Sequence, residues 1–204
     1  MEQMGLTQAT LIFIVANVFL SIIGFTNDRF VRWGLLTTEG VLKRQEWHRV
    51  LVSGFLHADP MHLFVNMLTL FFFGPLMEFV LGPQTFFLVY LGSLLAGSAL
   101  ALVMNAKNMD YAALGASGAV SGVLFSFCLY APFEMIYFFG IIPIPAILFA
   151  VLYVAYSVYG MGARRDNIGH DAHLGGAIGG VLLTILLKPE IVPHFLNEIS
   201  GLFG

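Results

Sequence analysis

One serine and one histidine stand inside small-residue, apolar segments, where polar side chains are costly. Ser117 belongs to the sequence Gly-Ala-Ser-Gly at positions 115–118, and His173 precedes Leu-Gly-Gly at positions 174–176. A serine hydroxyl becomes an effective nucleophile when a neighbouring base removes its proton, and an imidazole can be that base. Each residue alone also fits an ordinary role in helix packing. Together they predict nucleophilic catalysis, provided that the fold brings them into contact.

A second polar pair lies in another apolar segment. His62 and Asn66 are four residues apart among Leu, Phe, Met and Val, so they share one face of a helix. Two such side chains could donate hydrogen bonds to the negative oxygen of a tetrahedral intermediate. The alternative is a polar clasp between helices, of the kind found in many membrane proteins.

Metal chemistry is the competing interpretation of the same groups. Four histidines and two aspartates are potential zinc ligands, namely His57, His62, His170, His173, Asp59 and Asp171. However, the chain has no His-Glu-x-x-His motif, and neither histidine pair has the four-residue spacing that places two ligands on one helix face. The sequence therefore predicts no metal and no cofactor, and a chelator that abolished activity would reverse this ranking.

The composition defines the class of protein that must position these groups. Of the 204 residues, 58% are hydrophobic and 10% are charged, and the mean hydropathy is +0.87. Soluble domains carry about 25% charged residues, so these values indicate an integral membrane protein with the lipid bilayer as its surroundings. The net charge of −3 and the absence of a basic run argue against a nucleic-acid partner.

Hydrophobic segments long enough to cross a bilayer need about 20 residues and must be helical in lipid. Six segments are candidates: Thr7–Phe25, Met61–Leu81, Gln84–Met104, Leu114–Phe133, Pro145–Tyr159 and Ala172–Leu187. We therefore expect an all-α membrane protein in which residues 1–204 form a single six-helix bundle. The long first loop, at about residues 26–60, mixes tryptophans with basic residues and is predicted to lie in the membrane interface. Gly82 and Pro83 predict a tight turn between antiparallel second and third spans.

Small residues follow one face of two of these spans. Gly118 and Gly122 are four residues apart in the fourth span, and Ala172, Gly176 and Gly180 have the same spacing in the sixth. Small residues at this spacing allow two membrane helices to approach closely. If the two faces meet, Ser117 and His173 come within hydrogen-bonding reach.

These segments together resemble the rhomboid family of intramembrane serine proteases. The resemblance rests on Gly115–Gly118 at the start of a span, on Gly169 four residues before His173, and on Phe-Leu-His at 55–57 ahead of the His62 and Asn66 pair. It covers the chain from about Thr7 to Leu187. It implies a six-helix bundle of rhomboid type and an endopeptidase that cuts membrane proteins in or near their transmembrane helices.

The resemblance also implies roles for individual residues. Ser117 is expected to be the nucleophile and His173 its general base, in a dyad without an acidic third member. His62, Asn66 and the backbone N–H of Ser117 are expected to form the oxyanion hole. Supporting residues are expected at Gly115, Gly118, Ser121, Trp47, Arg49, Glu78 and Gly176.

Three of the supporting residues carry particular expectations. Trp47 and Arg49 resemble the family's tryptophan-arginine element, although His48 separates them here, and Arg49 is expected to be structural. Glu78 resembles a position that links helix ends, and its alternative is an interfacial carboxylate. Many family members have an aromatic ring one turn after the serine, stacked on the catalytic imidazole. This chain has Ser121 there, and we expect its hydroxyl to replace that contact with a hydrogen bond.

A rival base stands three residues before His173. His170 is expected in the loop or in the first turn of the last span, where water is available. His173 is favoured as the base because it lies farther along the span and beside the small-residue face.

The fifth span has helix-breaking residues at both ends. Pro143 and Pro145 stand at its start, and Gly160 and Gly162 at its exit. Such a helix could swing to admit a substrate from the side, or these residues could simply end it.

Orientation in the membrane can be inferred in two ways that conflict. Eight of the nine basic residues fall in the first, third and fifth loops: Arg29, Arg32, Lys43, Arg44, Arg49, Lys107, Arg164 and Arg165. The positive-inside rule places these loops in the cytoplasm. The family resemblance implies the opposite, with the active site opening to the outside of the cell membrane, and we follow it.

Overall fold

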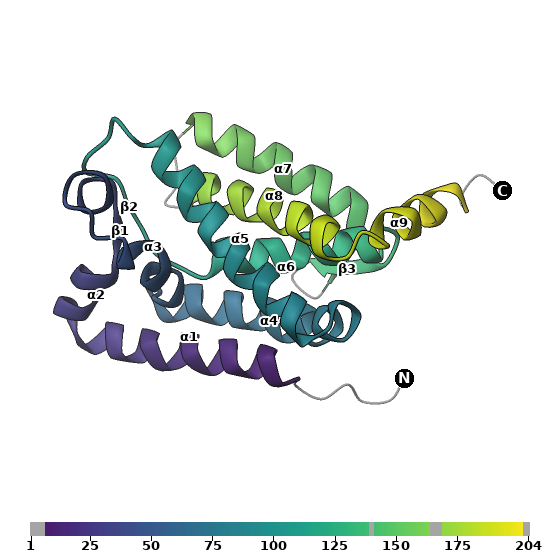
Figure 1. Ribbon diagram of the computed structural model, residues 1–204, viewed down its shortest axis with the longest axis horizontal. Helices are drawn as coiled ribbons and strands as arrows, with labels where there is room; N and C mark the ends of the chain where they lie inside the picture. Colours follow the sequence, from purple (N-terminus) through teal and green to yellow (C-terminus); the bar gives the residue numbers. More distant parts are fainter. Residues whose placement is uncertain (1–6, 139–140, 164–168, 202–204) are drawn as a thin grey trace.

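The computed structural model describes residues 7–138, 141–163 and 169–201, and helices dominate this part of the chain (Figure 1). Within these described ranges, four helices are long and apolar enough to cross a membrane, namely α1 (Gln8–Thr26), α4 (Pro60–Leu81), α5 (Pro83–Met104) and α8 (His170–Leu187). Two further apolar helices, α6 (Ser117–Tyr130) and α7 (Ala146–Ala163), are shorter in the part whose side chains the structure describes, which for α7 is Ala146–Met161. Four of the six predicted spans therefore meet the length requirement, and the count of six stays a prediction.

The turn between α4 and α5 confirms the antiparallel pair predicted from Gly82 and Pro83. The helix α4 begins with Asp59 as its N-cap, whose carboxylate accepts the backbone N–H of His62 at 2.8 Å, and with Pro60 in the first turn. It ends at Leu81, and Gly82 takes a φ of +81°, which favours glycine. Pro83 then starts α5 directly.

The helix α6 is shorter than the predicted span Leu114–Phe133. It has 14 residues, which at 1.5 Å per residue gives a length of about 21 Å, against about 30 Å for the hydrocarbon core of a bilayer. The chain ahead of it is held in place by the protein, since the backbone N–H of Gly115 donates to the carbonyl of Ser53 at 2.9 Å. The serine at 117 is therefore the first residue of a helix that starts inside the molecule.

An antiparallel hairpin follows α6, and the sequence did not predict it. The strands β3 (Met135–Phe138) and β4 (Ile142–Pro145) pair with Met135 opposite Pro145. Pro143 and Pro145 cannot donate hydrogen bonds within a helix but are tolerated in edge strands. The predicted start of the fifth span at Pro145 is therefore corrected to Ala146, where α7 begins.

The first loop folds into several short elements instead of an extended connection. They are α2 (Asp28–Gly34), β1 (Leu36–Thr37), a π-helical turn η1 (Glu39–Lys43), α3 (His48–Val52) and the 3-10 turn η2 (Ser53–Phe55). Leu36 pairs with Ala113 of β2 (Ala112–Ala113), which joins the first loop to the chain just before α6. The position of this first loop in the membrane interface stays a prediction. Arg164 and Arg165, which were assigned to the fifth loop, lie outside the described residues.

The helices α5, α6 and α8 pack together in the middle of the molecule. Figure 1 shows α1 and α4 along one edge and α7 along the opposite edge, with α9 (Ile191–Ser200) projecting beyond the end of α8. At that far end the His194 ring stacks on Tyr130 with ring centroids 5.1 Å apart, and its Nε2 lies 2.7 Å from the Tyr130 carbonyl. The N-terminal ends of α4, α6 and α8 lie at the other end of the bundle, away from α9 (Figure 1).

Candidate active site

The faces of small residues on α6 and α8 meet, which is the condition under which the sequence placed Ser117 and His173 within reach of each other. A Cβ atom added at Gly176 would lie 2.0 Å from the carbonyl oxygen of Gly118, and one added at Gly180 would lie 2.4 Å from the Cα of Gly122. Ordinary van der Waals contact of a Cβ begins at 3.4 Å. The two helices are therefore in backbone contact over two turns, and side chains larger than hydrogen would separate them.

This contact continues to the start of both helices, where the two candidate catalytic residues lie. A Cβ atom at Gly118 would be 3.2 Å from the carbonyl oxygen of Ala172. Ser117 directly precedes Gly118 in α6, His173 directly follows Ala172 in α8, and both side chains are partly exposed. The structure thus brings Ser117 and His173 to the same end of two touching helices, and neither is sealed in the core.

His62 lies against the loop that precedes Ser117. A Cβ atom at Gly115 would be 2.6 Å from the His62 imidazole, and Gly115 has a φ of +129°, which L-residues with side chains rarely adopt. One turn farther along α4, Asn66 is 5% exposed and donates through Nδ2 to the His62 carbonyl at 2.9 Å. An amide nitrogen carries two hydrogens, and this bond uses one of them. The His62 side chain therefore faces the start of α6, and Asn66 lies one turn behind it on the same helix.

His57 also holds this loop, which the sequence suggested only through a short motif. The backbone N–H of Ala116 donates to His57 Nε2 at 3.4 Å, so Nε2 carries no proton and the neutral ring has its proton on Nδ1. That nitrogen lies 2.8 Å from the Ser21 hydroxyl, which in turn donates to the Phe55 carbonyl. Burial, with a smaller effect from nearby His62, lowers the pKa of His57 to about 3. His57 is therefore neutral, and its ring holds the backbone of Ala116, the residue before the candidate nucleophile.

Asp171 connects the start of α8 to the third loop. Its carboxylate accepts hydrogen bonds from Asn105 Nδ2 at 2.5 Å, from the Tyr111 hydroxyl at 3.0 Å and from the backbone N–H of Ala172 at 2.8 Å. Burial and the neighbouring carboxylate raise the pKa of Tyr111, so its hydroxyl keeps the proton that it donates. The sequence presented Asp171 only as a possible metal ligand, because its partners lie about 60 residues away.

The rival base His170 is more buried than expected. It is the first residue of α8, consistent with the predicted first turn, but it is only 3% exposed, so the expectation of water around it is wrong. The ring fills the space that glycine leaves on α7, because a Cβ atom at Gly160 would lie 2.2 Å from His170 Nε2. The ring of His173 is 6.4 Å away from that of His170 and is partly exposed. The two histidines therefore differ in accessibility, and the more accessible one is His173.

Arg49 and Glu78 each tie separate segments together away from Ser117. Arg49 is 7% exposed, and its guanidinium donates to the carbonyls of Arg32 and Leu35 and to the Glu46 carboxylate, whereas Trp47 is 61% exposed. Glu78 is 5% exposed and does not reach the interface as a solvated carboxylate. It accepts hydrogen bonds from the first turn of α1, donated by the Thr7 and Thr10 hydroxyls and the N–H groups of Ala9 and Thr10.

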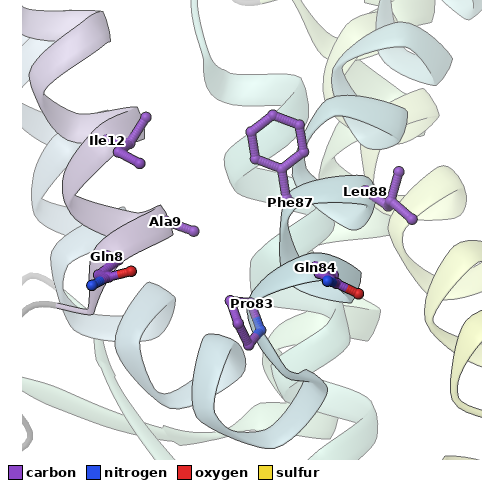
Figure 2. A pocket seen from close by; sticks show the side chains of 7 residues that line it. All are labelled: Gln8, Ala9, Ile12, Pro83, Gln84, Phe87 and Leu88. Atoms are coloured by element: carbon purple, nitrogen blue, oxygen red, sulfur yellow. The ribbon is translucent and has the colours of Figure 1, made fainter.

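A cleft with a volume of about 450 Å³ lies at the opposite end of the bundle. Figure 2 shows it between the first turns of α1 and α5, lined by Gln8, Ala9, Ile12, Pro83, Gln84, Phe87 and Leu88. None of these side chains is a candidate catalytic group. Among the residues that the structure describes, no three histidine, cysteine, aspartate or glutamate side chains gather where they could hold a metal ion.

The helices and the polar groups at one end of them define a multi-pass membrane protein. The chain belongs to the rhomboid family, because the Rhomboid domain model matches residues 44–190. This finding confirms the resemblance inferred from the sequence.

Named relatives agree with this assignment. The chain is 29% identical to RHOMBOID-like protein 12, mitochondrial, of Arabidopsis thaliana over 81% of this chain and 52% of that protein. It is 36% identical to Rhomboid protein 1, mitochondrial, of Saccharomyces cerevisiae over 65% of this chain and 40% of that protein. It is 29% identical to rhomboid protease GluP of Bacillus subtilis over 91% of this chain and 36% of that protein. The matches thus span about half or less of these relatives.

Proposed function

We propose that this protein is an intramembrane serine endopeptidase that hydrolyses peptide bonds in or near the transmembrane helices of membrane-protein substrates. The observation that carries the proposal is the backbone contact between α6 and α8, which brings Ser117 and His173 to the same end of the bundle. Two further observations support it. His62 faces the loop before Ser117, with Asn66 hydrogen-bonded to the His62 carbonyl one turn along α4, and a relative in Bacillus subtilis is named as a rhomboid protease.

In the proposed reaction, neutral His173 removes the proton from the Ser117 hydroxyl while its oxygen attacks the carbonyl carbon of the scissile peptide. A tetrahedral oxyanion forms and then collapses, which breaks the C–N bond. His173 gives its proton to the leaving amine, and an acyl-enzyme ester remains on Ser117. Water, activated by His173, then releases the new carboxyl group and restores the hydroxyl.

The developing negative charge needs donors that are already in position. In this proposal they are the His62 side chain, the Asn66 amide and the backbone N–H of Ser117, which is one of the unpaired N–H groups in the first turn of α6. The positive end of the α6 dipole adds to their effect. Gly115 is required because any side chain there would strike His62.

A substrate helix hides its carbonyls in hydrogen bonds, so it must unwind locally before cleavage. We propose that the fifth transmembrane segment, α7, moves to admit it, because β4 and two prolines precede that helix. Loss of cleavage when α7 is crosslinked to α4 would support this route, and retained cleavage would exclude it. We also propose the outward-facing orientation in the cell membrane, which cysteine labelling at Lys43 tests. Two of the named relatives are mitochondrial, so a mitochondrial membrane is the alternative location.

Two other functions are possible for such a bundle. A relative without catalysis would bind membrane helices and pass them on, but it would not need both Ser117 and His173. A channel or transporter would need polar groups along a pathway. Here the candidate catalytic groups Ser117, His173 and His62 gather at the N-terminal ends of α6, α8 and α4.

The test uses purified full-length protein and a single-span membrane substrate. Cleavage that disappears in both Ser117→Ala and His173→Ala, together with covalent labelling of Ser117 by a fluorophosphonate, supports the proposal. Cleavage that persists in either variant, or that a chelator abolishes, overturns it. Binding without cleavage by the unaltered protein would favour the non-catalytic relative.

A further inference from the structure

The position one turn after Ser117 holds a hydroxyl instead of an aromatic ring. The structure supplies a ring from another helix. Tyr153 of α7 stacks on the His173 imidazole with centroids 6.1 Å apart and planes inclined by 24°. Its hydroxyl lies 2.5 Å from the Ser121 hydroxyl, in a hydrogen bond that either group can donate.

Tyr153 is itself held firmly on its other sides. Its ring packs against Phe125 of α6, with centroids 5.4 Å apart, and against Phe149 one turn earlier on α7, with centroids 5.9 Å apart. Phe125 is buried in the core of the bundle. The contacts of Tyr153 therefore reach both α6, which carries the candidate nucleophile, and α8, which carries the candidate base.

We infer that Tyr153 is the positioning residue of the catalytic base. Its ring fixes the plane of the His173 imidazole, and the Ser121 hydroxyl fixes the ring of Tyr153 at its far end. This inference rests on the proposed function, because it assigns to α7 a part in the same site. It also means that the base is correctly oriented only while α7 is packed against α6 and α8.

The ring and the hydroxyl of Tyr153 can be separated by substitution. Tyr153→Leu removes the ring, and the loss of an aromatic stacking contact corresponds to a decrease in kcat of roughly three- to tenfold. KM should change little, because the ring acts through His173 and not on the substrate. Tyr153→Phe keeps the ring and should retain most of the activity. Tyr159→Leu is the matched control, since that tyrosine is on the same helix and is 66% exposed.

A transfer of the ring gives the sharpest test. The double variant Ser121→Tyr, Tyr153→Leu places the aromatic ring one turn after Ser117. We expect it to label with fluorophosphonate faster than Tyr153→Leu alone. Size-exclusion chromatography and thermal unfolding identify any variant that fails to fold, and in that case the comparison of Tyr153→Phe with Tyr153→Leu decides.

Several results would overturn the inference. They are a kcat of folded Tyr153→Leu within twofold of the unaltered protein, a decrease no larger than that of Tyr159→Leu, a Tyr153→Phe variant as impaired as Tyr153→Leu, or a folded double variant that labels no faster than Tyr153→Leu. Ser117→Ala and His173→Ala are measured in parallel. If these two variants still cleave, the proposed function has failed, whereas if only the Tyr153 expectations fail, the proposed function stands without this positioning residue.

Discussion

Gly176→Ala should separate the two helices that carry the candidate dyad. The added methyl would lie 2.0 Å from the Gly118 carbonyl oxygen, where ordinary contact begins at 3.4 Å. The obstacle is backbone, so no side-chain rotation can relieve it, and the helices must move apart by about 1.4 Å. Overpacking of this kind costs about 1–3 kcal/mol, and the higher helix propensity of alanine offsets about 1 kcal/mol of that. We therefore expect a net destabilisation of about 0–2 kcal/mol.

The effect on catalysis should be larger than the effect on stability. Gly118 follows Ser117 directly, and Gly176 lies three residues after His173, so a separation at this contact is passed on to the two reacting groups. A misplacement of about 1 Å can lower the rate about 10²-fold. Gly180→Ala provides a matched variant, because its methyl meets Gly122 at 2.4 Å but one turn farther from the dyad. It should destabilise the protein similarly and lower kcat less.

Thermal unfolding in detergent and cleavage of a single-span substrate measure the two effects on the same preparations. Gly201→Ala serves as the control, since its methyl would meet the nearest backbone atom at 3.5 Å, which is ordinary contact. The reasoning is wrong if Gly176→Ala unfolds no earlier than this control and cleaves within threefold of the unaltered protein. Equal kcat values for Gly176→Ala and Gly180→Ala would refute the transmission of the separation to the dyad.

Three further predictions concern the residues that hold the bundle around the site. Glu78→Ala leaves the donors at the start of α1, including Thr10, without their acceptor, and should lower the free energy of unfolding by roughly 3 kcal/mol. Thermal unfolding measures this change, and an unchanged melting temperature would show that these hydrogen bonds do not stabilise the contact between α1 and α4. The pKa of His57 in the folded protein is about 3, below the ordinary value of 6.5. Between these two pH values only the unfolded chain binds a proton at this residue, so the free energy of unfolding falls as the pH drops through that range, by up to about 1.4 kcal/mol per pH unit. His57→Gln should flatten the decrease in melting temperature between pH 7 and pH 5, and an equally steep decrease would show that the proton accepted on unfolding belongs to another group. A lysine at position 49 cannot reproduce the three hydrogen bonds of the guanidinium, so Arg49→Lys should lower the free energy of unfolding by about 1–2 kcal/mol. The kcat at low temperature should stay the same, and a loss of kcat without a loss of stability would assign Arg49 to the reaction instead.

The sequence predicted the parts of the fold that depend on composition and local chemistry. Long apolar segments predicted the bounds of α1, α4, α5 and α8 to within a few residues, because lipid leaves the backbone no alternative to a helix. The glycine at 82 and the proline at 83 gave the turn between α4 and α5. The spacing of small residues showed that α6 and α8 could pack closely, since close approach of helices requires small side chains, but it did not decide that these two faces meet.

The parts that could not be predicted depend on distant contacts. The apolar run from Met135 to Pro145 fits a short strand or a helix equally well, and the pairing of β3 with β4 decides between them. The hydrogen bonds of Asp171 join residues about 60 positions apart in the chain. The ring of Tyr153 reaches His173 only because α7 lies beside α8, and a single sequence carries no signal of which helix faces meet.

The short length of α6 has a consequence for how cleavage sites would be selected. A helix of about 21 Å falls about 9 Å short of the hydrocarbon thickness, and its first residue carries the candidate nucleophile. In a substrate helix at 1.5 Å per residue, that shortfall corresponds to about six residues. If the protein has the proposed activity and the C-terminal end of α6 lies at one boundary of the hydrocarbon core, the distance of the cleavage site from the other boundary is fixed. Moving a susceptible sequence by one helical turn would then change its cleavage even when the sequence itself is unchanged.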